Sequence, residues 1–322
     1  MVYLGFEYQY ILNHFRFKDP KIKFLRHNEN LVYQVTDQNK VYLLRIHQPI
    51  EGFTLSLHQR HFPFEVYIKS EMEILEYLNK HSPITVQAPV KTKDGHLLTF
   101  LNDGTPVSVL TWIEGQALNE EMCNKDIAYN IGQMVGKMHL NLSDLKGYER
   151  YCYDQELVQK MMVEINTAYQ KEHLTKDQRE LIIQSLEFVE KQMNLLDQSK
   201  EEKVLVHYDL GLSNLIIKDD KISPIDFSLC GYGYYQMDVA ATAISFKDPE
   251  HRKATIKCFE DTVGIKVKIP LVETFFAFSL LLYITFQHEK ASKESWFEKA
   301  MQRWEKTIFK PLLQGKPFLF NL

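Results

Sequence analysis

Residues 206–227 read V-H-Y-D-L-G-L-S-N-L-I-I-K-D-D-K-I-S-P-I-D-F and carry the strongest indication of the chain's architecture. Four polar residues stand close together in this stretch: His207, Asp209, Asn214 and Asp226. The first three lie between two short apolar runs, and Asp226 follows a predicted hairpin that turns at D-D-K. A loop of this kind can present several oxygen ligands to one point.

This pattern suits phosphoryl transfer, in which the protein mainly positions the reactants and neutralises charge. The reaction needs a carboxylate to orient the attacking hydroxyl and hard oxygen ligands to hold Mg²⁺ on the phosphates. Asp209 fits the first role, and Asn214 and Asp226 fit the second. The spacing from Asp209 to Asn214 is that of a kinase catalytic loop, although Asp226 is followed by Phe-Ser and not by Phe-Gly.

At these residues the sequence resembles the aminoglycoside phosphotransferase and choline kinase-like family, a small-molecule branch of the protein-kinase-like fold. Members carry H-G-D or a variant, then four residues and Asn, then I-D-F or I-D-W, and then Gly and a D-x-A helix start. This chain has V-H-Y-D-L-G-L-S-N, S-P-I-D-F and, from Gly233 to Ala240, G-Y-Y-Q-M-D-V-A. Further similar segments extend the resemblance over most of the chain; they are Asn30–Val35, Tyr42–Ile46, Leu110–Gly115 and Gly136–His139.

The resemblance implies a role for each matching residue in this stretch. Asp209 looks like the catalytic aspartate, and His207 would brace its loop. Asn214 and Asp226 look like the ligands of Mg²⁺, with ATP as the phosphate donor. Asp238, at the helix start, would be a structural acid that ties the loop or helix together.

The resemblance also implies how the nucleotide is held. In L-T-W-I-E-G, Leu110 would lie behind the adenine, with the carbonyl of Thr111 and the amide of Ile113 bonded to its edge. Arg45, in Y-L-L-R-I, stands where this fold usually presents a Lys to the phosphates. Arg can neutralise phosphate and bind it bidentately, but the two side chains are not interchangeable.

The glutamate expected to pair with Arg45 is best matched by Glu71, which borders the apolar face of a predicted helix at Glu65–Lys80. Glu65 and Glu73 remain alternatives. The stretch between Arg45 and Glu71 is long and is expected to form an extra loop.

A second departure from the kinase pattern is the missing glycine-rich loop. The corresponding place, Leu25–Asn30, reads L-R-H-N-E-N. Asn tolerates unusual backbone angles, but it lacks the freedom that lets glycine approach phosphate closely. We expect this departure to affect nucleotide affinity more than the fold.

The hydrophobic pattern divides the chain into a strand-rich part and a helical part. Strands are predicted at Leu31–Thr36, Val41–Ile46, His96–Leu101 and Pro106–Ile113. Helices are predicted at Asn124–Asn141, Tyr153–Tyr169, Lys176–Leu196 and Pro270–His288, with Thr175 as a possible N-cap. We therefore predict an α+β, bilobal, protein-kinase-like fold. Residues 1–113 would form an N-terminal nucleotide-binding lobe, an antiparallel sheet with one helix, and residues 114–322 a mainly helical catalytic and acceptor-binding lobe.

Composition excludes several other classes of protein. The formal net charge of the 322 residues is −4, too near neutral for a nucleic-acid binder. The four cysteines form no C-x-x-C pair, which favours reduced thiols in a cytoplasmic protein. The most apolar run, Phe275–Phe286, is shorter than a membrane span and is interpreted as a buried core helix.

The sequence thus predicts an ATP- and Mg²⁺-dependent enzyme that phosphorylates a hydroxyl of a small molecule, such as an amino alcohol, a sugar or an aminoglycoside. Arg45 and the glycine-poor loop keep a pseudokinase or nucleotide-binding regulatory protein open. A protein Ser/Thr kinase is disfavoured, because the twelve residues Phe227–Asp238 leave no evident activation segment. Tyr232, Tyr234 and Tyr235 either line an acceptor pocket or pack between helices.

Overall fold

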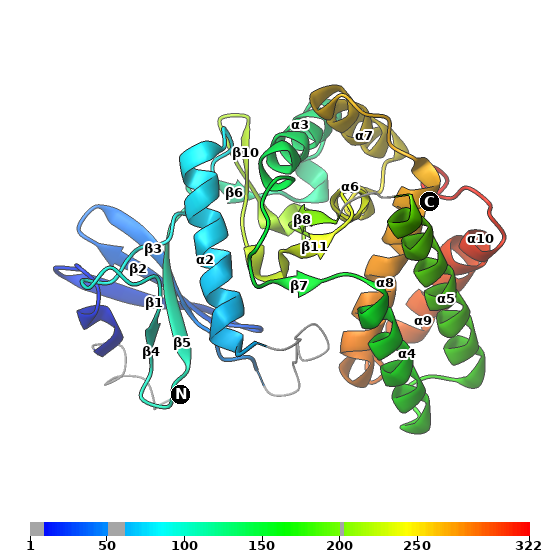
Figure 1. Ribbon diagram of the computed structural model, residues 1–322, viewed down its shortest axis with the longest axis horizontal. Helices are drawn as coiled ribbons and strands as arrows, with labels where there is room; N and C mark the ends of the chain where they lie inside the picture. The colour runs from blue at the N-terminus through cyan, green and yellow to red at the C-terminus, as the bar shows by residue number, and fades with distance from the viewer. Residues whose placement is uncertain (1–9, 51–61, 200–202) are drawn as a thin grey trace. The chain divides into compact units, whose positions relative to one another are not determined.

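The structure is a computed structural model that describes residues 10–50, 62–199 and 203–322. These residues divide into two compact units, and the division falls between Gly115 and Gln116 (Figure 1). Most of the loop expected between Arg45 and Glu71 lies outside the described residues.

The first unit is built on a five-stranded antiparallel sheet with the strand order β1-β2-β3-β5-β4. The strands are β1 (Pro20–His27), β2 (Leu31–Asp37), β3 (Lys40–Ile46), β4 (Thr99–Phe100) and β5 (Pro106–Thr111). The strands predicted at Leu31–Thr36 and Val41–Ile46 are confirmed, and they form a hairpin in which Asp37 pairs with Lys40 across a two-residue turn. The prediction of a strand over His96–Leu101 is wrong for most of its length, because only Thr99 and Phe100 pair with β5.

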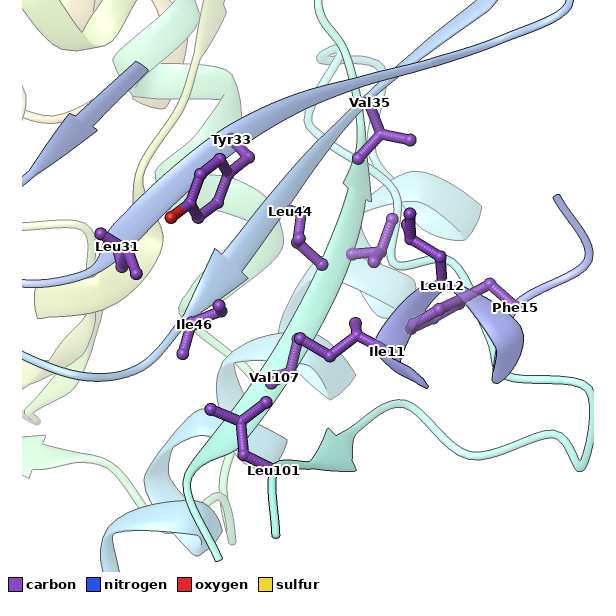
Figure 2. Close-up of a cluster of buried hydrophobic side chains, with 11 residues drawn as sticks. Ile11, Leu12, Phe15, Leu31, Tyr33, Val35, Leu44, Ile46, Leu101 and Val107 are labelled. Carbon is purple, nitrogen blue, oxygen red and sulfur yellow. The ribbon is translucent and has the colours of Figure 1, made fainter. Parts of the chain in front are cut away.

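Alternate residues of these strands point into one apolar core (Figure 2). Leu44 on β3 and Val107 on β5 are fully buried in it, together with Ile11 from a helical turn at residues 10–13. This packing holds β3 and β5 together along the register from Tyr42 opposite Thr111 to Ile46 opposite Val107. Arg45 therefore lies on β3, a strand whose position beside β5 is fixed by packing of the apolar core.

Helix α2 (Phe64–His81) confirms the helix predicted at Glu65–Lys80. It buries one stripe of side chains, including Ile68, Met72 and Leu75, at the spacing read from the sequence. It ends at Ser82, whose extended backbone is what a following proline requires.

The second unit is mainly helical. Its helices are α3 (Lys125–Leu142), α4 (Gln155–Gln170), α5 (Lys176–Gln198), α6 (Gln236–Ile244), α7 (Pro249–Val263), α8 (Ile269–Ala291), α9 (Phe297–Trp304) and α10 (Lys310–Leu313). The predicted helices are confirmed with ends displaced by at most a few residues. Thr175 caps α5 in a capping box with Gln178.

Helix α7 was not predicted from the sequence, although its ends carry ordinary signals. Asp248 caps it, Pro249 opens it and Gly264 ends it in the left-handed region. It packs closely along α3, where a Cβ on Gly132 would overlap the Thr255 carbonyl. Glycine is thus required in α3 by the approach of α7.

Helix α8 contains the most apolar run of the sequence. By length and composition it is long and apolar enough to cross a membrane, and 61% of its most apolar window is buried inside the protein. Its buried side chains, such as Phe275, Phe278 and Leu281, come from all sides of the helix. This confirms the expectation of a buried core helix for Phe275–Phe286.

Two small sheets in the second unit flank the motif residues, which lie in the connections between and after the strands. One has the order β10-β9-β6 and the other β7-β11-β8. The strands are β6 (Gln116–Ala117), β7 (Tyr151–Cys152), β8 (Val204–Val206), β9 (Leu215–Lys218), β10 (Lys221–Pro224) and β11 (Gly231–Gly233). The hairpin predicted at D-D-K is confirmed, with Asp219 and Asp220 both at positive φ.

Candidate active site

The catalytic loop predicted from the sequence connects β8 to β9. Asn214 reaches back across this loop, and its Nδ2 donates to the Asp209 carboxylate at 2.7 Å and to the Asp209 carbonyl at 3.0 Å. Both side chains are partly exposed. Because the nitrogen of the Asn214 amide is committed to Asp209, its oxygen is the atom left to accept a ligand.

Asp238 anchors the start of this loop from the first turn of α6. Its two carboxylate oxygens accept the backbone N–H groups of His207, at 3.0 Å, and Tyr208, at 2.7 Å. Burial raises the pKa of Asp238 to about 7, and these two backbone hydrogen bonds oppose the rise. Asp238 thus holds the two residues that precede Asp209.

His207 links the catalytic loop to the strand that leads to Asp226. Its Nδ1 accepts the Asp209 N–H at 3.3 Å, so its Nε2 carries the proton and donates to the Ile225 carbonyl at 3.1 Å. Burial lowers the pKa of His207 to about 4, and the charge of Asp226 only partly offsets this. His207 is therefore a neutral brace with both ring nitrogens engaged.

The buried, neutral state of His207 makes stability depend on pH. The unfolded chain binds a proton at this residue near pH 6.5, but the folded chain binds it only near pH 4. The contribution is therefore fully present above about pH 6.5 and falls by about 3 kcal/mol as the pH drops to 4. Urea unfolding of the parent and of His207→Asn between pH 4 and 7.5 checks this. In the variant, the free energy of unfolding should fall less steeply between pH 6.5 and 4 than in the parent. An equal pH dependence in both proteins contradicts the assignment of this effect to His207.

Asp226 follows β10, and main-chain bonds tie its position to Asn214. The Ile225 N–H donates to the Asn214 carbonyl at 2.9 Å. Asp226 itself lies in the left-handed region, with φ of 66°. Such a conformation is strained for a residue other than glycine and clusters at functional sites.

The donor set of Asn214 and Asp226 fits a magnesium ion bound with a nucleotide. An amide oxygen and a carboxylate are hard ligands, and Mg²⁺ usually takes one or two carboxylates from the protein and the rest from phosphates and water. Within residues 10–50, 62–199 and 203–322, no group of three or more His, Cys, Asp or Glu side chains could hold a metal by itself. The site thus fits a metal that arrives with phosphates better than a metal cage made by the protein alone.

In the first unit, the structure joins Arg45 to Glu71. The Arg45 Nη2 lies 2.8 Å from the Glu71 Oε1, and the two side chains are only 4% and 2% exposed. Of the three glutamates considered, Glu65 is exposed and Glu73 pairs with Lys69 on the surface. Glu71 is therefore the partner of Arg45.

The three residues expected near the adenine lie on or just after β5. Leu110 is buried and pairs with Leu43 on β3, while Thr111 and Ile113 are partly exposed. The Thr111 carbonyl already accepts the Gln87 side-chain amide at 3.3 Å. A carbonyl oxygen has two lone pairs, so this contact leaves room for one more donor.

The glycine-poor segment Leu25–Asn30 covers the end of β1 and the turn into β2. It is held by the chain that follows β3, because the Ile50 N–H donates to the Asn28 carbonyl at 2.7 Å. The His27 ring also contacts the Gln48 carbonyl at 3.0 Å. These bonds give the turn a defined shape without glycine.

Sequence reasoning did not single out Arg150 and Tyr153, which contact the segment directly after Asp226. A single Arg and a single Tyr in K-G-Y-E-R-Y-C-Y give no signal of this role. The structure also decides between pocket lining and helix packing for two of the three tyrosines Tyr232, Tyr234 and Tyr235. Tyr234 is fully buried, with its hydroxyl 2.5 Å from Asp197 on α5, and the ring of Tyr235 stacks on Phe259 of α7. These two tyrosines pack between helices.

Comparison with known proteins gives a family and a fold. Residues 21–256 match the profile of the phosphotransferase enzyme family. The amicoumacin kinase of Bacillus subtilis (strain 168) is 25% identical over 232 residues, which are 70% of this chain and 62% of that protein. The chain thus spans about three fifths of the length of this curated relative.

Two solved structures cover nearly all of this chain. The amicoumacin kinase hAmiN, in complex with AMP-PNP, Ca²⁺ and Ami, has a TM-score of 0.76 at 19% identity. The superposition covers 98% of this chain and 95% of the hAmiN chain. A microcompartment-associated aminopropanol kinase has a TM-score of 0.76 at 17% identity. This superposition covers 98% of this chain and 99% of the aminopropanol kinase chain. These likenesses confirm the protein-kinase-like fold predicted from the sequence.

Proposed function

Because the chain belongs to the phosphotransferase enzyme family, we propose that it is an ATP-dependent kinase that phosphorylates a hydroxyl group of a small molecule. The observation that carries this proposal is the pairing of Asp209 with Asn214 at 2.7 Å on the loop after β8. This pairing holds the Asp209 carboxylate in one orientation on the loop, as a general base that receives the proton of a substrate hydroxyl must be held.

In this mechanism the second unit carries the chemistry. Asp209 orients the acceptor hydroxyl and accepts its proton as the hydroxyl oxygen bonds to the γ-phosphorus. The bond between that phosphorus and the β,γ-bridging oxygen breaks at the same time, and ADP leaves. Asn214 and Asp226 would hold Mg²⁺, which supplies charge neutralisation on the phosphates. His207 and Asp238 keep the loop in place through its backbone and touch no reacting atom.

The first unit would bind the nucleotide. Arg45 would contact the α- and β-phosphates, and Glu71 holds its guanidinium in one orientation. Leu110 would pack behind the adenine, with the Thr111 carbonyl and the Ile113 amide on its edge. In this proposal residues 1–113 form the nucleotide-binding lobe and residues 114–322 the catalytic and acceptor-binding lobe.

For the acceptor we propose a small amine-bearing alcohol. The names of the relatives support this class, since one acts on amicoumacin and another on aminopropanol. The proposal places the enzyme in the cytoplasm and needs no nucleic acid and no membrane. The net charge of −4 agrees with a small-molecule partner.

The experiment that tests the function measures ADP release by the purified chain with Mg-ATP and a panel of acceptors. The panel contains amino alcohols, aminoglycosides, amicoumacin, homoserine and simple sugars. We expect at least one amine-bearing alcohol to raise ADP release above the rate without acceptor, and EDTA to abolish the increase. Equal ADP release with and without every acceptor argues against the kinase.

A second candidate, a nucleotide-binding pseudokinase, is favoured by Arg45 in the usual Lys position and by the turn at Leu25–Asn30. Isothermal calorimetry with Mg-ATP separates the two functions. Binding together with acceptor-dependent turnover supports the kinase, and binding without turnover supports the pseudokinase. No binding at all contradicts both.

A further inference from the structure

The segment that follows Asp226 is held by side chains from a distant part of the chain. Four consecutive carbonyls, those of Phe227, Ser228, Leu229 and Cys230, each accept a hydrogen bond from Arg150 or Tyr153. The short 3₁₀ turn at Phe227–Leu229 makes one such bond itself, because its Phe227 carbonyl accepts the Cys230 N–H at 3.0 Å. The donors from Arg150 and Tyr153 come from outside the turn.

Arg150 supplies most of these donors. Its Nη2 donates to the Ser228 carbonyl at 2.6 Å and to the Phe227 carbonyl at 3.1 Å, and its Nε donates to the Cys230 carbonyl at 2.7 Å. Arg150 is 5% exposed, so its planar guanidinium is buried among these oxygens. A lysine ammonium has three donors on one atom and cannot span the same carbonyls.

Tyr153 contacts both the segment that precedes Asp209 and the segment that follows Asp226. Its hydroxyl donates to the Leu229 carbonyl at 2.5 Å, three residues after Asp226. Its ring stacks on the ring of Tyr208 at 4.1 Å, and Tyr208 directly precedes Asp209. One fully buried side chain thus touches the loop of Asp209 and the turn of Asp226.

The backbone keeps Arg150 and Tyr153 in register with this turn. Strand β7 pairs with β11, and the Tyr153 N–H donates to the Tyr232 carbonyl at 2.8 Å. The approach is close, because a Cβ on Gly231 would lie 2.6 Å from the Tyr151 carbonyl. The pairing of β7 with β11 therefore fixes where the side chains of Arg150 and Tyr153 lie, and both side chains are buried.

Tyr208 adds a reason for the stacking contact. Its φ is +68°, a conformation that bulky residues rarely adopt. The Asp238 carboxylate holds its N–H, and Tyr153 covers its ring. The strained backbone before Asp209 is thus held at both its main chain and its side chain.

We propose that Arg150 and Tyr153 are positioning residues that fix the turn of Asp226 relative to the loop of Asp209. The inference rests on the proposed kinase function, because it assigns these two residues to the geometry of the same site. Neither residue touches a reacting atom. Their removal therefore loosens Asp226 and weakens the use of Mg²⁺ without removing a ligand.

The experiment compares Tyr153→Phe with Tyr234→Phe. Both tyrosines are fully buried and both hydroxyls donate to oxygen acceptors, but the acceptors of Tyr234 lie on α5 and not in the segment after Asp226. Hydrogen–deuterium exchange is measured for the backbone amides of residues 225–231, and ADP release is titrated with Mg²⁺. For Tyr153→Phe we expect faster exchange in that segment. We also expect a roughly fivefold higher Mg²⁺ concentration for half-maximal rate, the factor that corresponds to one ordinary hydrogen bond.

Arg150→Lys extends the test. It keeps the positive charge but loses the planar guanidinium that reaches several carbonyls. We therefore expect the Mg²⁺ concentration for half-maximal rate to rise by about 10- to 100-fold, with the same faster exchange. Parent-like exchange and parent-like Mg²⁺ dependence in Tyr153→Phe overturn the inference and leave the kinase function standing. An equal change in Tyr234→Phe also overturns it. Absence of acceptor-dependent ADP release in the parent overturns the proposed function itself, and with it the positioning role of Arg150 and Tyr153.

Discussion

Asp209→Asn is expected to lower kcat for acceptor phosphorylation by about 10²- to 10⁴-fold, the range that a positioned general base contributes. The substitution keeps the shape of the side chain and an oxygen that can accept the Asn214 amide, which lies 2.7 Å away in the parent. What it removes is the negative charge that accepts the hydroxyl proton. We expect the affinity for Mg-ATP to stay near that of the parent, because Asp209 is not assigned to the nucleotide.

The matched control for this prediction is Asp220→Asn. Asp220 is an exposed residue of the β9–β10 hairpin with φ of 61°, a conformation that Asn adopts readily. Rates of ADP release with a productive acceptor, and calorimetric affinities for Mg-ATP, are compared among the three proteins. Full activity in Asp209→Asn, or an equal loss in Asp220→Asn, contradicts the role of Asp209 as base.

Glu71→Gln is expected to lower the free energy of unfolding by about 3–5 kcal/mol, the usual effect of removing one partner of a buried ion pair. The Arg45 guanidinium would lose the carboxylate that lies 2.8 Å from its Nη2 at a site 4% exposed. We also expect weaker binding of Mg-ATP, because the guanidinium is then no longer held in one orientation. Chemical unfolding and calorimetry measure the two effects.

Glu73→Gln is the control on the same helix. Glu73 is 38% exposed and lies 3.6 Å from Lys69, a surface pair worth about 0–1 kcal/mol. The same substitution should therefore change neither stability nor nucleotide affinity by much. Equal losses in the two variants would show that burial of the Arg45–Glu71 pair has no special effect.

A double variant separates the structural and functional roles of this pair. Arg45→Met combined with Glu71→Leu replaces two buried charges by apolar groups of similar volume, which is often neutral for stability. We expect most of the lost stability to return, while the affinity for Mg-ATP stays low because no cation faces the phosphates. Parent-like nucleotide affinity in the double variant would exclude Arg45 from phosphate binding.

Local sequence patterns predicted much of this molecule. The hairpin at Asp219 and Asp220 and the cap of α5 at Thr175 depend on neighbours within a few residues, and both are present. The spacing of Asp209 and Asn214 likewise predicted a loop that presents several oxygen ligands to one point, and in the structure the Asn214 Nδ2 lies 2.7 Å from the Asp209 carboxylate. These features rest on short-range geometry, which adjacent residue types largely specify.

Predictions failed or stayed open where the outcome depended on distant parts of the chain. The segment His96–Leu101 was predicted as a strand, but in the structure it meets the first end of β5, where Thr99 and Phe100 pair. Helix α7 carries a cap, a proline and a final glycine, but its hydrophobic pattern was too weak for a prediction from the sequence. The packing of α7 against α3 is a contact between distant segments. Strand pairing and helix packing are tertiary effects that override local preference.

The residue types and their spacing, with the family resemblance that they carry, were enough to predict a kinase-like fold and to propose Asp209, Asn214 and Asp226 as site residues. A phosphoryl-transfer loop needs Asp, Asn and a second Asp at set intervals along one short segment. Which glutamate pairs with Arg45, and which side chains hold the turn after Asp226, depended on folding. Glu71 differs from Glu73 only in the face of α2 that it occupies, and Arg150 reaches Ser228 only because β7 lies beside β11. The contacts of Arg150 join residues up to 80 positions apart, so no local pattern records them, whereas the helical pattern of α2 already favoured Glu71 over Glu65 and Glu73.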